Sequence, residues 1–87
     1  MTTLLVTHSV KDPDFWLASE KRAEFFGPLG VTNIRTFINP QDRSKVAVTL
    51  DVPDIEKLKA ALASPSGIAA MNYDGVLPET LVIHIES

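Results

Sequence analysis

Hydrophobic and polar residues alternate along four segments of the chain, as they do in half-buried β-strands. These segments are residues 2–10, 31–38, 44–52 and 79–86. The stretch between the second and third segments is Asn-Pro-Gln-Asp-Arg, a polar sequence rich in turn-forming residues. We therefore expect the second and third strands to form a hairpin.

The segment between the first and second strands has the spacing of a helix. Asp12 is suited to cap the free backbone N–H groups at its start, and Pro13 is suited to the first helical position. Gly27 and Pro28 stop the pattern. The sequence thus predicts one continuous helix over residues 13–26.

A second helical region follows the third strand. Ile55, Leu58 and Leu62 form an apolar stripe with helical spacing. Ser64 then begins a short further helix that includes Met71. The two helical regions separate the strands into the order βαββαβ.

This element order is the split βαβ, ferredoxin-like arrangement of the α+β class, and we expect a single domain over residues 1–87 with a four-stranded antiparallel sheet under a layer of helices. The more apolar strand faces should meet the helices; they carry Leu4, Val6, Val46, Val48, Leu50, Leu81, Ile83 and Ile85. The opposite face carries Leu5, Thr7, Arg35, Phe37, Ala47, Thr49, Val82 and His84. This mixture of small, hydroxyl and apolar groups favours a homodimer in which two sheets pack together. A monomer with a mildly apolar open sheet is the alternative.

Composition narrows the functional classes. The 87 residues include no cysteine, which excludes disulfides, thiolate metal sites and thiol catalysis and suits a reducing cytoplasm. The net charge of −3 argues against a nucleic-acid partner. The sequence has neither an apolar run long enough to span a membrane nor a signal-peptide pattern at its start, so we expect a cytoplasmic protein without a membrane partner.

Residues 51–58 (DVPDIEKL) and 61–65 (ALASP), followed by Met71 and Gly75, resemble the dimeric α+β barrel superfamily, which includes the antibiotic biosynthesis monooxygenase-like domains. The resemblance implies a homodimer whose two sheets form a barrel, with a ligand pocket in each subunit between sheet and helices. Members include cofactor-independent monooxygenases, haem-degrading enzymes, lactone isomerases and cyclase-like proteins. The haem-degrading branch places a haem-ligating histidine in the C-terminal helical segment, and residues 64–73 contain none. No cofactor is therefore expected.

The two histidines are candidates for chemistry. His8 shares the helix-facing side of the first strand with apolar residues, so it can line a pocket and act as a general base. A buried histidine that is bonded to backbone or water is the alternative. His84 lies on the other face of a neighbouring strand, so we expect an interface residue there and no metal site.

Four residues are candidates for substrate binding. Trp16 and Met71 are suited to form a pocket wall, and Tyr73 to donate a hydrogen bond to a substrate oxygen. A turn tyrosine that only packs is equally compatible with the pattern. Arg35 is suited to bind an acidic group or to pair with Asp51 across the sheet.

The charged run from Glu20 to Glu24, which includes Lys21 and Arg22, has the pattern of a solvated helix face. Two functions remain open. One is a metal-independent enzyme, monooxygenase-, isomerase- or cyclase-like, acting on a small apolar or aromatic molecule, with His8 as its catalytic residue. The other is a non-catalytic dimeric ligand-binding or assembly module.

Overall fold

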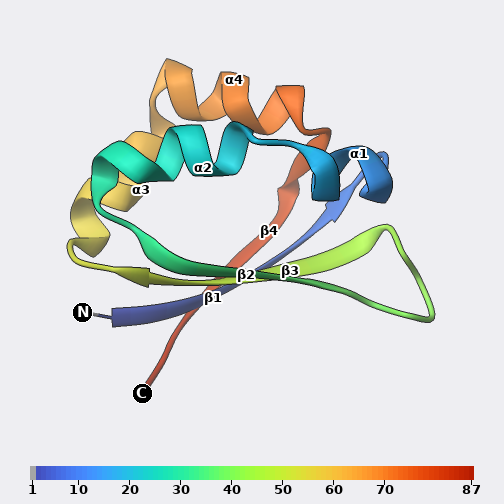
Figure 1. Cartoon of the computed structure of the whole chain (residues 1–87), viewed down its shortest axis with the longest axis horizontal. Helices are drawn as coiled ribbons and strands as arrows, with labels where there is room; N and C mark the ends of the chain where they lie inside the picture. The colour runs from blue at the N-terminus through green and yellow to red at the C-terminus, as the bar shows by residue number, and fades with distance from the viewer. Residues whose placement is uncertain (1) are drawn as a thin grey trace.

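Four antiparallel strands form one sheet in the order β2–β3–β1–β4, and the helices cover one of its faces (Figure 1). The computed structural model describes residues 2–87. The strands are β1 (Thr2–Val10), β2 (Thr32–Ile38), β3 (Lys45–Val52) and β4 (Val76–Ile85). Strands β1 and β3 occupy the centre of the sheet, with β2 and β4 at the edges. The predicted ferredoxin-like α+β fold is confirmed.

The helical layer contains four α-helices and one 3₁₀ turn within the described residues. They are α1 (Pro13–Ala18), α2 (Lys21–Phe26), η1 (Gly27–Leu29), α3 (Ile55–Ala63) and α4 (Pro65–Tyr73). Asp12, Asp54 and Ser64 cap α1, α3 and α4, each through a side-chain oxygen that accepts a backbone N–H bond. These caps follow the predicted helix starts. None of the described helices is long and apolar enough to cross a membrane.

The prediction of one continuous helix over residues 13–26 is wrong. The chain leaves the helix at Ser19, whose backbone is extended (φ −69°, ψ 137°). The Ser19 hydroxyl oxygen accepts a bond from the N–H of Lys21, 3.2 Å away. Local side-chain bonds of this kind compete with helical hydrogen bonds, so a serine can end a helix without glycine or proline. The break lets α1 and α2 take separate directions over the sheet (Figure 1).

The inner face of the sheet forms the core with the helices. Its most buried side chains, each no more than 2% exposed, are Leu4, Val10, Trp16, Leu50, Val52 and Leu58. Leu81 and Ile83 of β4 pack against this core as predicted. The prediction for Ile85 is wrong, because its side chain is 51% exposed. Figure 1 shows the C-terminal end of β4 running away from the helices, so nothing from that layer covers it.

The pairing of β1 with β4 is interrupted beside His8. Thr7 pairs with Val82, whereas Ser9 pairs with Leu77, so residues 78–81 of β4 lie opposite His8 alone. The hydroxyl of Thr80 spans the irregular segment. It accepts the Ser9 N–H at 2.8 Å and donates to the Leu77 carbonyl at 2.6 Å. This bulge bends the edge strand next to a candidate functional residue.

Candidate functional site

A small cavity of about 70 Å³ lies between the inner face of the sheet and the helices. Most of its lining is apolar, with contributions from Val6, Val48, Phe25, Leu58, Leu62 and Met71. The polar and charged side chains of the lining are His8, Lys21, Arg22 and Asp74. An apolar cavity with a few convergent polar groups is the usual form of a small-molecule site.

His8 reaches the cavity from β1, with only 8% of its surface exposed. Its Nδ1 atom is buried and has no hydrogen-bond partner among the described residues. Burial lowers the pKa of His8 below its ordinary value, because the charged ring is poorly solvated there. The positive charge of Arg22 acts in the same direction, while the Ser9 backbone and the Asp74 carboxylate oppose it. His8 is therefore held as a neutral imidazole near pH 7 with an unused polar atom.

Trp16 is the side chain that joins His8 to the helical layer. Trp16 is 1% exposed. Its indole and the imidazole of His8 meet edge to face, with their ring centroids 5.6 Å apart. The guanidinium carbon of Arg22 lies 4.3 Å from the indole centroid. Arg22 also donates a hydrogen bond from Nη1 to the Trp16 carbonyl at 3.0 Å. A cation stacked on an indole and bonded to the same residue is fixed in position.

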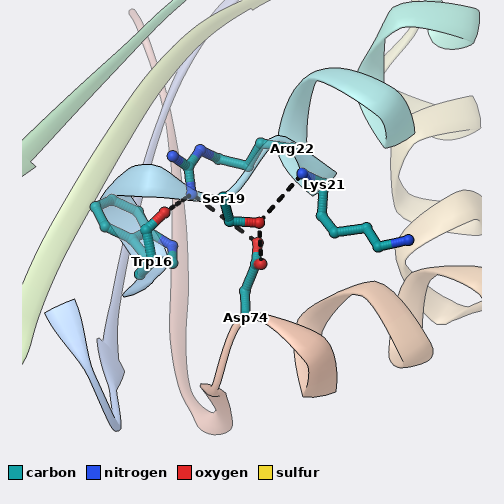
Figure 2. A network of polar contacts seen from close by, with 5 residues as sticks. All are labelled: Trp16, Ser19, Lys21, Arg22 and Asp74. Atoms are coloured by element: carbon teal, nitrogen blue, oxygen red, sulfur yellow. Dashed lines mark hydrogen bonds and ion pairs between the residues drawn. The ribbon is translucent and has the colours of Figure 1, made fainter. Parts of the chain in front are cut away.

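A polar network joins the α1–α2 link to the end of α4 (Figure 2). The Ser19 hydroxyl donates to Oδ1 of Asp74 at 2.5 Å, and Nη1 of Arg22 lies 4.0 Å from Oδ2 of the same carboxylate. Asp74 is 4% exposed and ends α4, and Gly75 follows it with a positive φ of 72°. Burial lowers the pKa of Arg22, and the Asp74 carboxylate partly offsets this effect.

The structure brings together three of the five residues that the sequence analysis selected. Trp16 and Met71 line the cavity with His8. Tyr73 lies outside it, 56% exposed, with its ring centroid 5.5 Å from that of Phe15. Tyr73 therefore packs on the surface of the helical layer.

Arg35 lies on the opposite side of the sheet from the cavity. It pairs in register with Thr49, and its guanidinium carbon is 5.6 Å from the Phe37 ring centroid. The alternative pairing with Asp51 is wrong. Asp51 instead accepts a hydrogen bond from the Thr3 hydroxyl at 2.6 Å. Residue 35 points away from the helices because strand residues alternate between faces.

Sequence reasoning missed Arg22, Asp74 and Ser19. The interpretation of Arg22 as part of a solvated face is wrong, because only 15% of its side chain is exposed. Lys21 and Glu24 of the same charged run are exposed, so the charge pattern does not show which of its residues is buried. Asp74 is 55 positions from Ser19, and no pattern along the chain signals that contact.

The second histidine is remote from the cavity. His84 is exposed and pairs with Leu5 across β4 and β1, on the open face of the sheet. Within residues 2–87, no three His, Cys, Asp or Glu side chains converge as metal ligands would. The placement of the two histidines on opposite faces agrees with their predicted strand faces.

Comparison with known proteins shows similarity in structure only. No protein-family model matches the chain, and no curated protein matches its sequence. A candidate antibiotic biosynthesis monooxygenase from Bordetella bronchiseptica has a TM-score of 0.72 at 12% identity, over 99% of this chain and 94% of that one. A second candidate, from Chloroflexus aurantiacus, has a TM-score of 0.65 at 19% identity, over 98% of this chain and 89% of that one.

A third structure has a described type of activity. SnoaB from Streptomyces nogalater, a cofactor-independent oxygenase, has a TM-score of 0.64 at 16% identity, over 98% of this chain and 87% of that one. Sequence identities this low establish shared architecture and leave the reaction open. The chain therefore has the fold of the antibiotic biosynthesis monooxygenase-like superfamily, and the resemblance seen in its sequence is confirmed at the level of the fold.

Proposed function

We propose that the chain is a homodimeric, metal-independent enzyme that acts on a small apolar or aromatic molecule in the cavity between sheet and helices. One observation carries this proposal. The buried, neutral imidazole of His8 lines an apolar cavity, and its Nδ1 has no hydrogen-bond partner among the described residues. Buried polar atoms are nearly always paired in folded proteins, so an unpaired one on a side chain that lines a cavity is suited to a ligand.

His8 supplies the reacting group in this proposal. A neutral imidazole accepts a proton from a weakly acidic C–H or O–H of the substrate and returns it at another position. Trp16 and Met71 provide the apolar wall that holds the substrate against the base. Tyr73 and Arg35 lie outside the cavity, and we assign them no role in it. Proton transfer of this type suits isomerisation or cyclisation directly, and in an oxygenase it precedes the reaction with dioxygen.

The size of the cavity limits the substrate. At about 70 Å³ it has roughly half the volume of an apolar cavity that accepts benzene, which is about 150 Å³. A small molecule of a few non-hydrogen atoms fits the closed form. An aromatic substrate requires the helices to move outward, and the break between α1 and α2 at Ser19 is a natural hinge for that movement.

The homodimer is supported by the open face of the sheet. Three large apolar side chains there are well exposed in the single chain: Leu5 at 39%, Phe37 at 44% and Val82 at 48%. Apolar groups gathered on one face favour a protein partner. A second copy of the chain presents the same face, and two such faces related by a two-fold axis cover each other.

Native mass spectrometry followed by an exchange assay tests the proposal. A gently purified dimer that retains small-molecule mass identifies a ligand. That ligand is then incubated with the protein in D₂O, and solvent deuterium entering its carbon-bound positions reports proton transfer. We expect His8→Gln to abolish the incorporation and His84→Gln to leave it unchanged. Binding without any deuterium incorporation or product would favour the non-catalytic ligand-binding module instead.

A further inference from the structure

Arg22 has more hydrogen-bonding capacity than the protein uses. A guanidinium carries five N–H donors in a fixed fork. Arg22 makes one hydrogen bond, from Nη1 to the Trp16 carbonyl, and its contact with the Asp74 carboxylate is an ion pair at 4.0 Å. The side chain is only 15% exposed. Water therefore reaches little of a cation whose remaining donors are unused by the described residues.

Asp74 is already engaged elsewhere. Its Oδ1 accepts the short bond from the Ser19 hydroxyl, and its Oδ2 stays beyond hydrogen-bond distance from Arg22. Figure 2 shows Ser19 lying between the ends of α1 and α4 in this contact. The carboxylate partly neutralises Arg22 from a distance without occupying its donors. A second acceptor can thus reach the guanidinium without breaking the Ser19–Asp74 bond.

The side chains of Arg22 and His8 meet at the same cavity. His8 and Arg22 both line it, and the indole of Trp16 contacts both side chains. The rest of the lining is mostly apolar, including Val48, Phe25 and Met71. The cavity therefore combines a cationic donor and a neutral imidazole with a wall suited to hydrocarbon.

We propose that the ligand of this cavity is a small apolar carboxylic acid, bound as its anion with the carboxylate oxygens on Arg22. A guanidinium matches a carboxylate in shape and charge, and such pairs form two parallel hydrogen bonds. His8 contacts the carboxylate or the adjoining carbon through Nδ1, and the hydrocarbon part lies against the apolar wall. This inference rests on the proposal that the cavity binds a small molecule, and it names the chemical class.

Charge and volume favour a monoanion of small size. Asp74 already neutralises part of the charge of Arg22, so the pair offers little net positive charge to hold a dianion such as phosphate. A cavity of about 70 Å³ admits a short acyl chain in its closed form. The charge at Arg22 and the volume of the cavity therefore both favour a short-chain carboxylic acid as the ligand.

The cavity adjoins the surface between α2 and α4. A surface groove there shares Lys21, Phe25 and Ala70 with the lining of the cavity. The Lys21 ammonium lies 3.6 Å from the Glu24 carboxylate and 5.1 Å from the Tyr73 ring centroid. The charges of Lys21 and Glu24 balance each other in this groove, so the cation that selects the ligand is Arg22 inside the cavity.

The single tryptophan of the chain provides a direct test, because Trp16 contacts both His8 and Arg22. Butyrate and butyramide, which differ in charge but hardly in shape, are titrated into the protein while Trp16 fluorescence is recorded. We expect saturable binding of butyrate at least tenfold tighter than that of butyramide. Arg22→Gln should weaken butyrate binding at least tenfold, and Arg35→Gln, on the other face of the sheet, should leave it unchanged.

Far-UV circular dichroism shows whether Arg22→Gln still folds. Two further variants test the proposal if it does not. Arg22→Lys keeps the charge without the fork and should bind butyrate more weakly than the natural protein. Asp74→Asn removes a repelling charge and should bind butyrate more tightly. Equal binding of butyrate and butyramide would overturn the proposal of a carboxylic acid ligand but not the proposal that the cavity binds a small molecule. If butyrate, butyramide and benzene all failed to bind, both proposals would be overturned.

Discussion

His8 of β1 and Trp16 of α1 pack edge to face, with ring centroids 5.6 Å apart and an interplanar angle of 78°. The contact joins the central strand of the sheet to the first helix. It also places the only tryptophan of the chain beside a buried polar atom, Nδ1 of His8. The core contact and the proposed ligand site therefore share the same pair of side chains.

The low pKa of His8 predicts a pH dependence of stability. Above its ordinary value of 6.5 the ring is neutral in both the folded and the unfolded chain. Below that value the unfolded chain takes up a proton that the folded protein resists, mainly because of burial. The free energy of unfolding should then fall with decreasing pH, by at most about 1.4 kcal/mol per pH unit for one proton, and level off once the folded form is protonated.

Urea unfolding between pH 8 and pH 5 measures this effect. His8→Gln should lose part of the decline that the natural protein shows below pH 6.5, while His84→Gln, at an exposed position, should keep it. If the free energy of unfolding changed with pH in the same way for the natural protein and His8→Gln, burial would not oppose protonation of this ring.

Trp16 should be the most costly single side chain to truncate. It is 1% exposed and is the largest fully buried side chain of the described residues. Trp16→Ala leaves a large cavity, and such changes cost about 3–5 kcal/mol. Leu17→Ala is the matched control, because Leu17 is 42% exposed and should change the free energy of unfolding by no more than about 0.5 kcal/mol. Similar losses in the two variants, measured by urea unfolding, would contradict the assigned core.

The absence of a side chain at Gly67 allows α3 and α4 to approach each other closely. A Cβ at this position would lie 2.2 Å from the Ala61 carbonyl oxygen and 2.8 Å from backbone atoms of Leu62. Gly67→Ala should destabilise the protein by about 1–3 kcal/mol, since backbone atoms cannot yield as a flexible side chain does. Thermal unfolding followed by circular dichroism measures the loss.

Gly27 is the matched control for Gly67. A Cβ there meets nothing within 4 Å, and the backbone is helical (φ −52°, ψ −52°). Gly27→Ala should therefore stabilise the protein by about 0.4–1 kcal/mol, because it restricts the unfolded chain. A loss of stability in Gly27→Ala equal to that in Gly67→Ala would refute the close helix contact as the cause.

Substitution by a charged residue on the open face of the sheet should prevent dimer formation. Phe37→Glu and Val82→Glu place a carboxylate at exposed apolar positions of that face. We expect both to shift the proposed dimer to a monomer in sedimentation velocity, because a charge in a packed interface is left unsolvated. Phe15→Glu alters an equally exposed side chain of the helical layer and should leave the dimer intact. A natural protein that sediments as a monomer would refute the proposed assembly.

Much of the fold follows from local pattern. The alternation from Thr2 to Val10 predicted β1 with its observed bounds, and His8 was placed on the helix-facing side. Asp12 and Ser64 marked the starts of α1 and α4 because caps act within a few residues of themselves. Strand period and capping are properties of neighbouring residues, so the chain encodes them without reference to the rest of the molecule.

The polar part of the site was decided by tertiary structure. Ser19 ends α1 by bonding the N–H of Lys21 and a carboxylate 55 positions away, and Arg22, expected on a solvated face, lines the cavity. Sequence pattern alone established the order of the elements and the face of His8. Only the packed structure determined that Arg22 and Asp74 lie beside it, because contacts between distant segments depend on how helices and sheet meet in space.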